Sequence, residues 1–467
     1  MPASPNMPTP SRWLPLLLAV AIFMQMLDAT ILNTALPQIA KDLNESPLNM
    51  QSAVIVYTLT VALLIPLSGY LVDRYGTKKI FFGAVGLFVF GSLLCASAVN
   101  LPMLVLARMV QGLGGSMLVP VPRLTILRVY DKSRLLNAIN YAVMPALIGP
   151  VLGPLAGGYL VEYASWHWIF LLNVPIGVLG LVIGWRIMPD IRGDKTSLDV
   201  GGFLLFAGAA CSLTLAVEIV SHTGVSLFPA LLASGGAALM WLYCRHAQSV
   251  AEPIYAGHLF KVRTFRLGLF GNLFSRLGIS SVPFLLPLMF QVAFGLGASL
   301  SGWLIAPIAL ASLLIKPAVK PLMARFGYRK VLIWNTRILG ILMILLALPD
   351  PNTPVAVWAV LLLTLGACNS IQFSAMNTLT LADLRPYQTG SGNSLMAVNQ
   401  QLAISLGIAV GALMLQAWRK SDIGQSDLHW AFRLTFIGIG IITFAAGFIF
   451  SRLHISDGRN LTVRSQK

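Results

Sequence analysis

Charged residues are scarce in this chain. They make up 10% of its 467 residues, whereas 57% of the residues are hydrophobic and the mean hydropathy is +0.78. Soluble domains carry about 25% charged residues. The composition therefore excludes an ordinary soluble protein and indicates that most of the chain is surrounded by lipid.

Residues that build disulfides, metal sites and catalytic centres are also few. The six histidines are dispersed, and the four cysteines, Cys95, Cys211, Cys244 and Cys368, lie apart in apolar runs. Their spacing fits neither a disulfide framework nor a zinc site. The sequence also lacks a nucleotide-binding loop, an HExxH motif and a nucleophile elbow. We therefore expect no enzyme activity, no metal site and no cofactor.

Long apolar runs, in contrast, recur along the whole chain. About 20 apolar residues are needed for a helix to cross a bilayer. The fourteen runs that we interpret as membrane-spanning helices cover residues 12–33, 50–72, 79–99, 102–122, 136–160, 167–188, 200–220, 227–246, 265–291, 300–323, 330–349, 354–376, 394–418 and 429–452. The connections between them are short, so the sequence predicts an all-α membrane protein with 14 transmembrane helices and no soluble domain.

The basic residues lie mainly on one side of this predicted topology. The loops on the opposite side hold only Lys41, Arg419, Lys420 and Arg433 among the 32 lysines and arginines. Cytoplasmic loops carry such an excess of positive charge, so we expect both termini in the cytoplasm. The net charge of +16 then lines the cytoplasmic membrane face, and no nucleic-acid partner is expected.

Two short segments of the chain resemble each other. GYLVDRYGTKK at residues 69–79 and PLMARFGYRK at 321–330 align without gaps at an offset of 251 residues, which pairs Gly76 with Gly327. We interpret this as a repeat of a six-helix unit, with the seventh and eighth helices inserted between the copies. The alternative is that basic residues merely cap cytoplasmic helix ends, which explains the charges but not the shared order of aromatic residue, glycine and cations.

The repeat divides the chain into three parts. We expect an N-terminal six-helix bundle at residues 1–190, two inserted helices with cytoplasmic linkers at 191–264, and a C-terminal six-helix bundle with a short tail at 265–467. Parallel repeats of this kind are a transporter architecture, with the substrate site between the halves near the membrane midplane.

Four further motifs accompany the segment at 69–79. They are LARMVQGLGGS (106–116), GPVLGPLAGGYL (149–160), LDATILNTALP (27–37) and WHWIFLLNVPIG (166–177). The segment at 69–79 and the first of these motifs resemble the loop 2–3 and fourth-helix signatures of the major facilitator superfamily. GPVLGPLAGGYL resembles the fifth-helix motif associated with antiporters. The last two resemble signatures of the fourteen-helix drug:proton antiporter branch of that family.

This resemblance implies a major facilitator fold of two six-helix bundles plus two inserted helices. It implies a proton-coupled antiporter that exports small organic molecules, as a multidrug-type efflux transporter, and that works as a monomer in a bacterial-type inner (plasma) membrane. The expected partners are a small-molecule substrate, protons and the lipid bilayer. A dedicated exporter of a metabolite or organic anion is the alternative, because the branch also includes exporters of metabolites.

One acidic residue lies deep in the first apolar run. A carboxylate near the centre of a membrane helix costs about 2.5–3.5 kcal/mol and usually faces a cavity or a partner. Asp28 and Arg108, in the first and fourth predicted helices, are at similar depth. Burial disfavours the charged carboxylate and a nearby arginine favours it, so Asp28 could exchange a proton when its partner moves. The alternative is a permanent ion pair that holds two helices together.

The loop at 69–79 is a candidate gate. Asp73 could accept hydrogen bonds from a neighbouring helix terminus or an arginine of the same half and so stabilise one of two conformations. Ala324 occupies the corresponding place in the second half, which predicts a one-sided gate. A solvated loop that only sets topology is the alternative, and it explains the lysines but not Asp73. The residues assigned to this motif are Gly69, Asp73, Arg74, Gly76, Lys78 and Lys79.

Small residues recur every four positions in the fifth predicted helix. Gly149, Gly153 and Gly157 form one face, beside Pro150, Pro154 and Gly158. Small faces let helix backbones approach closely, so tight packing is expected here. The resemblance adds a flexible contact between the two halves.

Polar residues inside the second half bear on the substrate. Arg276 lies near the middle of the ninth predicted helix, with Asn272 one turn earlier, and the repeat maps Arg276 onto Gln25. We expect Gln25 and Arg276 to face a central cavity from opposite halves, and Arg337 to lie either in that cavity or in a helix contact. Such a cavity would favour neutral or anionic substrates over lipophilic cations. Six amides either line it or join helices: Asn369, Gln372, Asn377, Asn399, Gln400 and Gln401.

Overall fold

The computed structural model describes residues 11–193, 197–224, 226–385, 388–421, 427–458 and 461, and all regular structure in these ranges is helical. The first group of helices is α1 (Leu14–Asp42), α2 (Gln51–Leu64), α3 (Leu67–Tyr75), α4 (Thr77–Ala96), α5 (Leu101–Leu118), α6 (Pro120–Val129), α7 (Lys132–Ala146), α8 (Gly149–Tyr163), α9 (His167–Leu171) and α10 (Asn173–Ile187). They are followed by α11 (Val200–Thr223) and α12 (Leu227–Ser249). The last group is η1 (Gly257–Lys261), α13 (Arg263–Ile279), α14 (Val282–Leu288), η2 (Met289–Ala293), α15 (Ala298–Leu314), α16 (Lys316–Phe326), α17 (Tyr328–Leu345), α18 (Val355–Leu381), α19 (Thr389–Lys420) and α21 (Leu428–Ser451).

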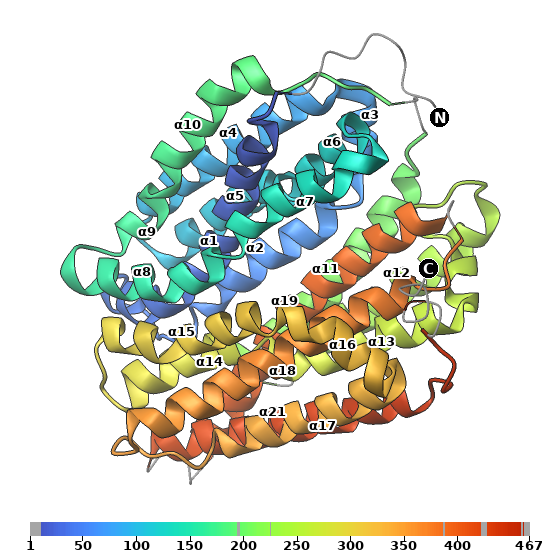
Figure 1. Ribbon diagram of the computed structural model, residues 1–467. Coiled ribbons are helices and arrows are strands. Elements are labelled where there is room, and N and C mark those ends of the chain that lie inside the picture. The colour runs from blue at the N-terminus through green and yellow to red at the C-terminus, as the bar shows by residue number, and fades with distance from the viewer. Residues whose placement is uncertain are drawn as a thin grey trace.

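The helices form two bundles that lie side by side. In Figure 1 the blue-to-green bundle contains α1–α10 and the yellow-to-red bundle contains α13–α21. We call these the N-half and the C-half. The end of the bundles where α1 begins and α21 ends is called the terminal face, and the opposite end the far face.

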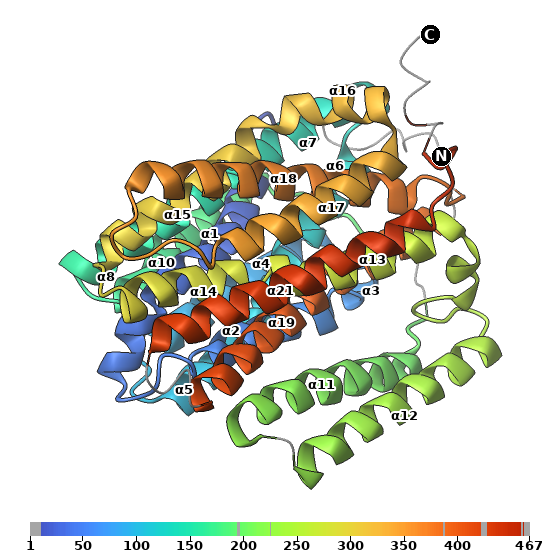
Figure 2. The same cartoon turned by 90° about the horizontal axis from the view of Figure 1, so that it is seen from below.

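The inserted helices α11 and α12 pack against each other at the edge of the molecule (Figure 2). At their terminal-face end, the Asp199 carboxylate accepts a hydrogen bond from Gly202 N (2.8 Å) and shares one with His246 Nε2 of α12 (2.7 Å). Burial opposes the charge on Asp199, but these hydrogen bonds outweigh it and hold the pKa of that carboxyl below its usual value. Gln51 of α2 donates to Ser221 of α11 (2.7 Å), which ties the pair to the N-half.

Both halves contain the same bent helix pair. α2 and α3 meet at 58°, and α15 and α16 meet at 57°. Pro66 and Pro317 lie at the two breaks, where a proline removes a backbone donor. The second helix of each pair is followed by a glycine, Gly76 after α3 and Gly327 after α16. The φ angles of these residues, +92° and +76°, favour glycine. Because these glycines are the pair matched by the sequence offset, the geometry supports the repeat.

The surface and the helix lengths are those of a multi-pass membrane protein. Eleven helices of the described chain are long and apolar enough to cross a bilayer, and each bent pair taken as one span would raise the number to thirteen. Large apolar side chains point outward, such as Leu227 (76% exposed) and Trp185 (69% exposed). The remaining expected span, 330–349, coincides with α17, which carries three basic residues.

The two halves touch closely at the far face. Ser299 N of α15 donates to Glu162 Oε2 of α8 (2.8 Å), and Trp303 Nε1 donates to the Tyr159 hydroxyl (3.1 Å). These contacts hold α8 and α15 together near the far face.

Candidate functional site

The deepest acid of the N-half lies in a polar cluster between helices. Asp28 of α1 and Arg108 of α5 are each 1% exposed, and Arg108 NH1 donates to Asp28 Oδ2 at 2.7 Å. An isolated charge in this place would be costly, and the pairing offsets that cost. The structure therefore places the two residues together, as their equal depth in the sequence indicates.

Two amides complete the shell of the carboxylate. Gln111 Nε2 and Asn173 Nδ2 donate to Asp28 Oδ1 at 2.8 and 3.3 Å, and both also reach Ser92 Oγ at 2.9 and 3.4 Å. Arg108 NH1 donates in turn to Gln111 Oε1 at 2.6 Å. The cluster thus joins α1, α4, α5 and α10.

Aromatic rings enclose the charged side of Arg108. Its guanidinium lies 4.1 Å from the centre of the Tyr57 ring and 6.0 Å from that of Phe170, and its Nε donates to Ala53 O at 3.4 Å. A cation over a ring face is favoured electrostatically, the more so where water is excluded. Arg108 therefore has ring and backbone contacts in addition to its ion pair with Asp28.

One atom of the cluster is a spare hydrogen-bond acceptor. Asn173 Oδ1 is buried and has no hydrogen-bond partner among the described residues. A protonated Asp28 becomes a donor and needs an acceptor. Asn173 can supply that acceptor by a turn of its side chain, so the same shell suits both protonation states.

Gln111, Asn173 and Ser92 were not among the site residues predicted from the sequence. Gln111 and Asn173 do lie inside two of the family motifs, LARMVQGLGGS and WHWIFLLNVPIG, and so a signal for them existed. Ser92 lies in an apolar run without such a motif, and only the packing of α4 on α5 brings it to the cluster.

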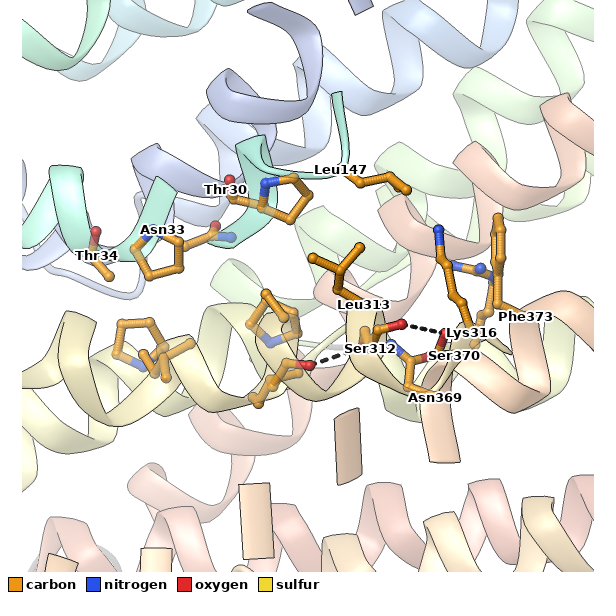
Figure 3. A pocket seen from close by; sticks show the side chains of 18 residues that line it. Thr30, Asn33, Thr34, Leu147, Ser312, Leu313, Lys316, Asn369, Ser370 and Phe373 are labelled. Carbon is orange, nitrogen blue, oxygen red and sulfur yellow. Dashed lines mark hydrogen bonds between the residues drawn. The ribbon is translucent and has the colours of Figure 1, made fainter. Parts of the chain in front are cut away.

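A cavity of about 330 Å³ lies between the two halves (Figure 3). Its lining from the N-half consists of Thr30, Asn33, Thr34, Leu147, Pro150 and Pro154. Its lining from the C-half consists of Arg276, Pro283, Pro287, Ile305, Ile308, Ala309, Ser312, Leu313, Lys316, Asn369, Ser370 and Phe373. In Figure 3, Thr30, Asn33 and Thr34 lie on one side of the cavity and Lys316, Asn369, Ser370 and Phe373 on the other. We call it the central pocket.

The central pocket includes some of the expected residues and not others. Arg276 lines it, whereas Gln25, Asn272 and Arg337 are not part of its lining. Gln25 and Asn272 are buried within the helix packing, at 4% and 1% exposure. Expecting Gln25 to face the cavity opposite Arg276 was therefore wrong for this conformation, because α1 turns Thr30, Asn33 and Thr34 toward the pocket instead.

Arg337 lies in a helix contact, the second of the two places expected for it. Its guanidinium is within 5.3–5.8 Å of the ring centres of Trp334, Phe444 and Phe448. Its side chain packs on Gly447 of α21. Arg337 therefore joins α17 to α21 by contacts with aromatic rings.

The candidate gate contains an ion pair within the N-half. Arg128 NH2 of α6 donates to Asp73 Oδ1 of α3, with both side chains partly buried. A Cβ on Gly193 would lie 2.1 Å from that oxygen, so the chain after α10 passes closely over Asp73. Asp73 thus has the arginine partner of the same half that the sequence analysis considered.

The other gate residues differ in how tightly they are held. A Cβ on Gly76 would lie 2.1 Å from Asp190 Oδ1, and Lys78 Nζ donates to Trp185 O at 2.7 Å. Arg74 donates to the Tyr70 hydroxyl of its own helix, and Lys79 is exposed. A Cβ on Gly69 would meet nothing within 4 Å. Of the two glycines of this motif, only Gly76 is therefore closely approached by a neighbouring segment.

The glycine face of α8 packs on α1 of the same half. Cβ atoms on Gly149, Gly153 and Gly157 would lie 2.0–3.0 Å from atoms of residues 27, 30 and 34. The contact between the halves involves the neighbouring positions instead. A Cβ on Gly158 would lie 2.4 Å from Ala298 O of α15. The expected contact between halves thus exists, but the three-glycine face does not make it.

The backbone of α8 also meets α15 at a second small residue. A Cβ on Gly302 of α15 would lie 2.2 Å from Pro154 O. Pro150 and Pro154 in addition line the central pocket. This helix therefore carries both an internal packing face and the closed contact at the far face.

Two similar bundles around a central pocket, with a buried charged cluster in one of them, define a membrane transporter of the alternating-access class. Comparison with known proteins agrees. The family profile described as Major Facilitator Superfamily matches residues 18–408 and, separately, 268–464. The chain belongs to the Major Facilitator Superfamily, and it is a transporter rather than an enzyme.

Relatives of similar length support this assignment. HsrA of Haemophilus influenzae, which is named as a transport protein, is 42% identical over 95% of this chain and 96% of its own length. MdtD of Salmonella heidelberg, which is named for multidrug resistance, is 40% identical over 99% of both chains. The crystal structure of a bacterial homologue of the human lysosomal transporter Spinster aligns with a TM-score of 0.67 and 16% identity, over 97% of this chain and 99% of the other. That last likeness shows the fold alone.

Proposed function

We propose that this protein is a proton-coupled antiporter that exports small organic molecules across a bacterial inner membrane, as a multidrug-type efflux transporter. The observation that carries the proposal is the Asp28 cluster, in which a fully buried carboxylate has both a cationic partner and a spare acceptor. The family membership supports a small-molecule substrate, and the name of the MdtD relative supports the breadth of substrates.

The cluster can couple proton binding to helix movement. In the ionised state, Asp28 is held by Arg108, Gln111 and Asn173, so α1, α5 and α10 are locked together. Protonation of Asp28 removes its charge attraction to Arg108. Arg108 would then stay in place through its contacts with the aromatic rings, while α1 could move. α1 also lines the central pocket at Thr30, Asn33 and Thr34, less than two turns further on. A shift of α1 would therefore change the cluster and the pocket together.

Contacts at the gate and at α8 would each stabilise one of the two conformations. We propose that the Asp73–Arg128 pair stabilises one of them on the cytoplasmic side. Gly158 and Gly302 would allow the close contact of α8 and α15 that seals the opposite side. Proton binding at Asp28 would then bias an equilibrium between two preformed packings.

We propose 14 membrane spans, with α17 as the fourteenth, and both termini in the cytoplasm. The helix order and the clustering of basic residues at the terminal face support this topology. We further propose the division into two bundles at 1–190 and 265–467 with an inserted part at 191–264, and function as a monomer. The bent pair in each half and the separate family match of residues 268–464 support that division.

Asp28→Asn tests the coupling. The amide keeps the shape of the side chain but cannot carry a proton, so we expect the variant to fold, to bind substrate and to lose uphill export driven by a pH gradient. The measurement is export and substrate-linked proton movement in the same proteoliposomes. Asp42→Asn is the matched control, because Asp42 ends the same helix at the far face and bonds only to Gln38 in the described structure (2.8 Å). Wild-type rates of both processes in Asp28→Asn would show that Asp28 is a structural ion-pair partner.

A dedicated exporter of a metabolite or organic anion is the second candidate. The observation that favours it is the presence of Arg276 and Lys316 in the lining of the central pocket.

A further inference from the structure

The central pocket contains two cationic side chains and no acidic one. Arg276 comes from α13 and Lys316 from the start of α16, and none of the described residues that line the pocket is an aspartate or glutamate. Arg276 is partly buried and Lys316 is exposed at the pocket, and charges at such positions are screened less than in bulk water. The lining therefore creates a positive potential where a substrate would bind.

Arg276 is not neutralised by the protein. The structure shows no ion pair or hydrogen bond for it among the described residues, and its Nε is buried without a partner. Its guanidinium lies 4.9 Å from the centre of the Phe373 ring, which supports the cation but leaves its donors free. Arg108 shows the contrast, since its charge is matched by Asp28. Arg276 lines the central pocket, so a ligand bound there can accept hydrogen bonds from its guanidinium.

The pocket hydroxyls do not reverse this preference. Thr30, Thr34, Ser312 and Ser370 donate to backbone carbonyls, so they offer only lone pairs to a ligand. Lone pairs alone would suit a cationic ligand. Charge-assisted hydrogen bonds are, however, roughly twice as strong as neutral ones, and a hydroxyl can rotate to donate. The two full charges therefore decide which ligands bind.

Apart from the amides of Asn33 and Asn369, the remaining lining is apolar. Four prolines (Pro150, Pro154, Pro283 and Pro287) and the side chains of Ile305, Ile308, Leu147 and Leu313 surround the cations. Figure 3 shows Lys316 and Phe373 on the same side of the pocket, away from Asn33 and Thr34. A ligand would thus meet positive charge at one end, apolar surface along its length, and the neutral polar side chains of Thr30, Asn33 and Thr34 at the other end.

We propose that the central pocket binds small amphipathic organic anions, in which one carboxylate or sulfonate head contacts Arg276 and Lys316 and an apolar or aromatic body lies against Phe373 and the prolines. This inference rests on the proposed function, because it takes the central pocket as the transport site. With this preference for anions, lipophilic cationic drugs would be poor substrates.

The test compares three ligands with one skeleton and different charge. They are 1-naphthalenesulfonate, 1-naphthalenesulfonamide and 1-naphthylmethylammonium, and their binding to the purified protein in nanodiscs is measured by calorimetry at neutral pH without a proton gradient. We expect the sulfonate to bind best and the ammonium worst, with about a tenfold or larger difference between them.

Four single variants locate the binding site. Arg276→Gln and Lys316→Gln should each weaken sulfonate binding about tenfold and leave ammonium binding unchanged or stronger. Arg337→Gln is the matched control for the arginine, because Arg337 also lies among aromatic rings but not in the pocket. Lys320→Gln is the control for the lysine, one turn further along α16. Both controls should bind the sulfonate as the wild type does.

The outcomes separate this inference from the proposed function. Preferred binding of the ammonium, absence of sulfonate binding, or equal losses in Arg276→Gln and Arg337→Gln would overturn the anion site. Binding needs no proton gradient, so sulfonate binding together with uphill export by Asp28→Asn would overturn only the coupling. Proton-coupled export of the ammonium without sulfonate binding would overturn only the substrate class.

Discussion

At the scale of single residues, the chain keeps two arginines inside the membrane in opposite ways. Arg108 forms an ion pair with Asp28 and donates a hydrogen bond to Gln111 Oε1. Arg276 has no such partner among the described residues and faces the central pocket. The first arrangement suits a proton site and the second a site for an anionic ligand.

The amide of Gln111 is expected to set the pH range of transport. Gln111→Met keeps the volume but removes a donor to the Asp28 carboxylate (2.8 Å) and an acceptor for Arg108 (2.6 Å). Loss of these two hydrogen bonds changes how the carboxylate and Arg108 are held, so the pH profile of substrate-linked proton movement should differ from that of the wild type. Ser92→Ala removes a hydroxyl that touches the two amides but not the carboxylate, and it should move the profile much less. Identical profiles in the wild type and Gln111→Met would contradict the role given to this amide.

At the scale of elements, the loop after α3 is held by one half only. Asp73 pairs with Arg128, whereas the repeat offset places Ala324 and Leu379 at the corresponding positions of the C-half. The bend and the glycine turn are thus common to both halves, but the ion pair is not. This difference explains why the gate is expected on one side of the pseudo-symmetry axis.

Asp73→Asn and Arg128→Gln should each slow turnover roughly twofold to fivefold, since partly exposed ion pairs contribute about 0.5–1 kcal/mol. Substrate binding should change less than turnover, because the pair lies outside the central pocket. The double variant should be no slower than the slower single variant if the two residues act only through each other. Ala324→Ser is the control in the other half. Additive losses in the double variant, or an equal loss in Ala324→Ser, would speak against a one-sided gate.

At the scale of the whole molecule, the two halves carry different chemistry on one repeated scaffold. The offset places Ile279, Ala359 and Leu362 in the C-half where the N-half has Asp28, Arg108 and Gln111. In the same way it places Gln25 and Ile65 where the C-half has Arg276 and Lys316. Proton binding is therefore proposed for the N-half, while the strong ligand contacts come from the C-half. Movement of one half against the other would couple the two.

The contact of α8 with α15 should control which conformation is populated. Gly158→Ala adds a Cβ that would lie 2.4 Å from Ala298 O, so it should disfavour the conformation closed at the far face. Spin labels at Tyr141 of α7 and Phe326 of α16, both exposed, should then move closer together as the terminal face closes. The measurement is the distance between the two labels by double electron–electron resonance. Cys211, Cys244 and Cys368 are replaced by serine, and Cys95 is kept because it is buried.

Gly83→Ala is the control for this experiment, because a Cβ at Gly83 would meet nothing within 4 Å. It should leave the distance distribution unchanged. An unchanged distribution in Gly158→Ala as well would show that the close contact at the far face does not decide the conformation.

The helices, their order and the charged pair of the N-half could be predicted from the sequence. A span is recognisable because crossing a bilayer needs about 20 apolar residues. The depth of Asp28 and Arg108 follows from their position in their runs, because a helix rises 1.5 Å per residue. The family motifs also contain Gln111 and Asn173, although their contact with Asp28 is visible only in the structure.

The side of each helix that faces the central pocket was decided only by the tertiary structure. Gln25 lies buried between helices, Arg337 packs on α21, and the α8 glycines pack on α1, whereas Lys316 reaches the pocket. In a soluble helix an apolar stripe marks the buried face. In a membrane helix the lipid is as apolar as the protein interior, so the sequence has no such stripe and does not reveal how the helix is rotated about its axis. Close packing of small and large side chains between neighbouring helices sets that rotation, and it is a property of the assembled bundle.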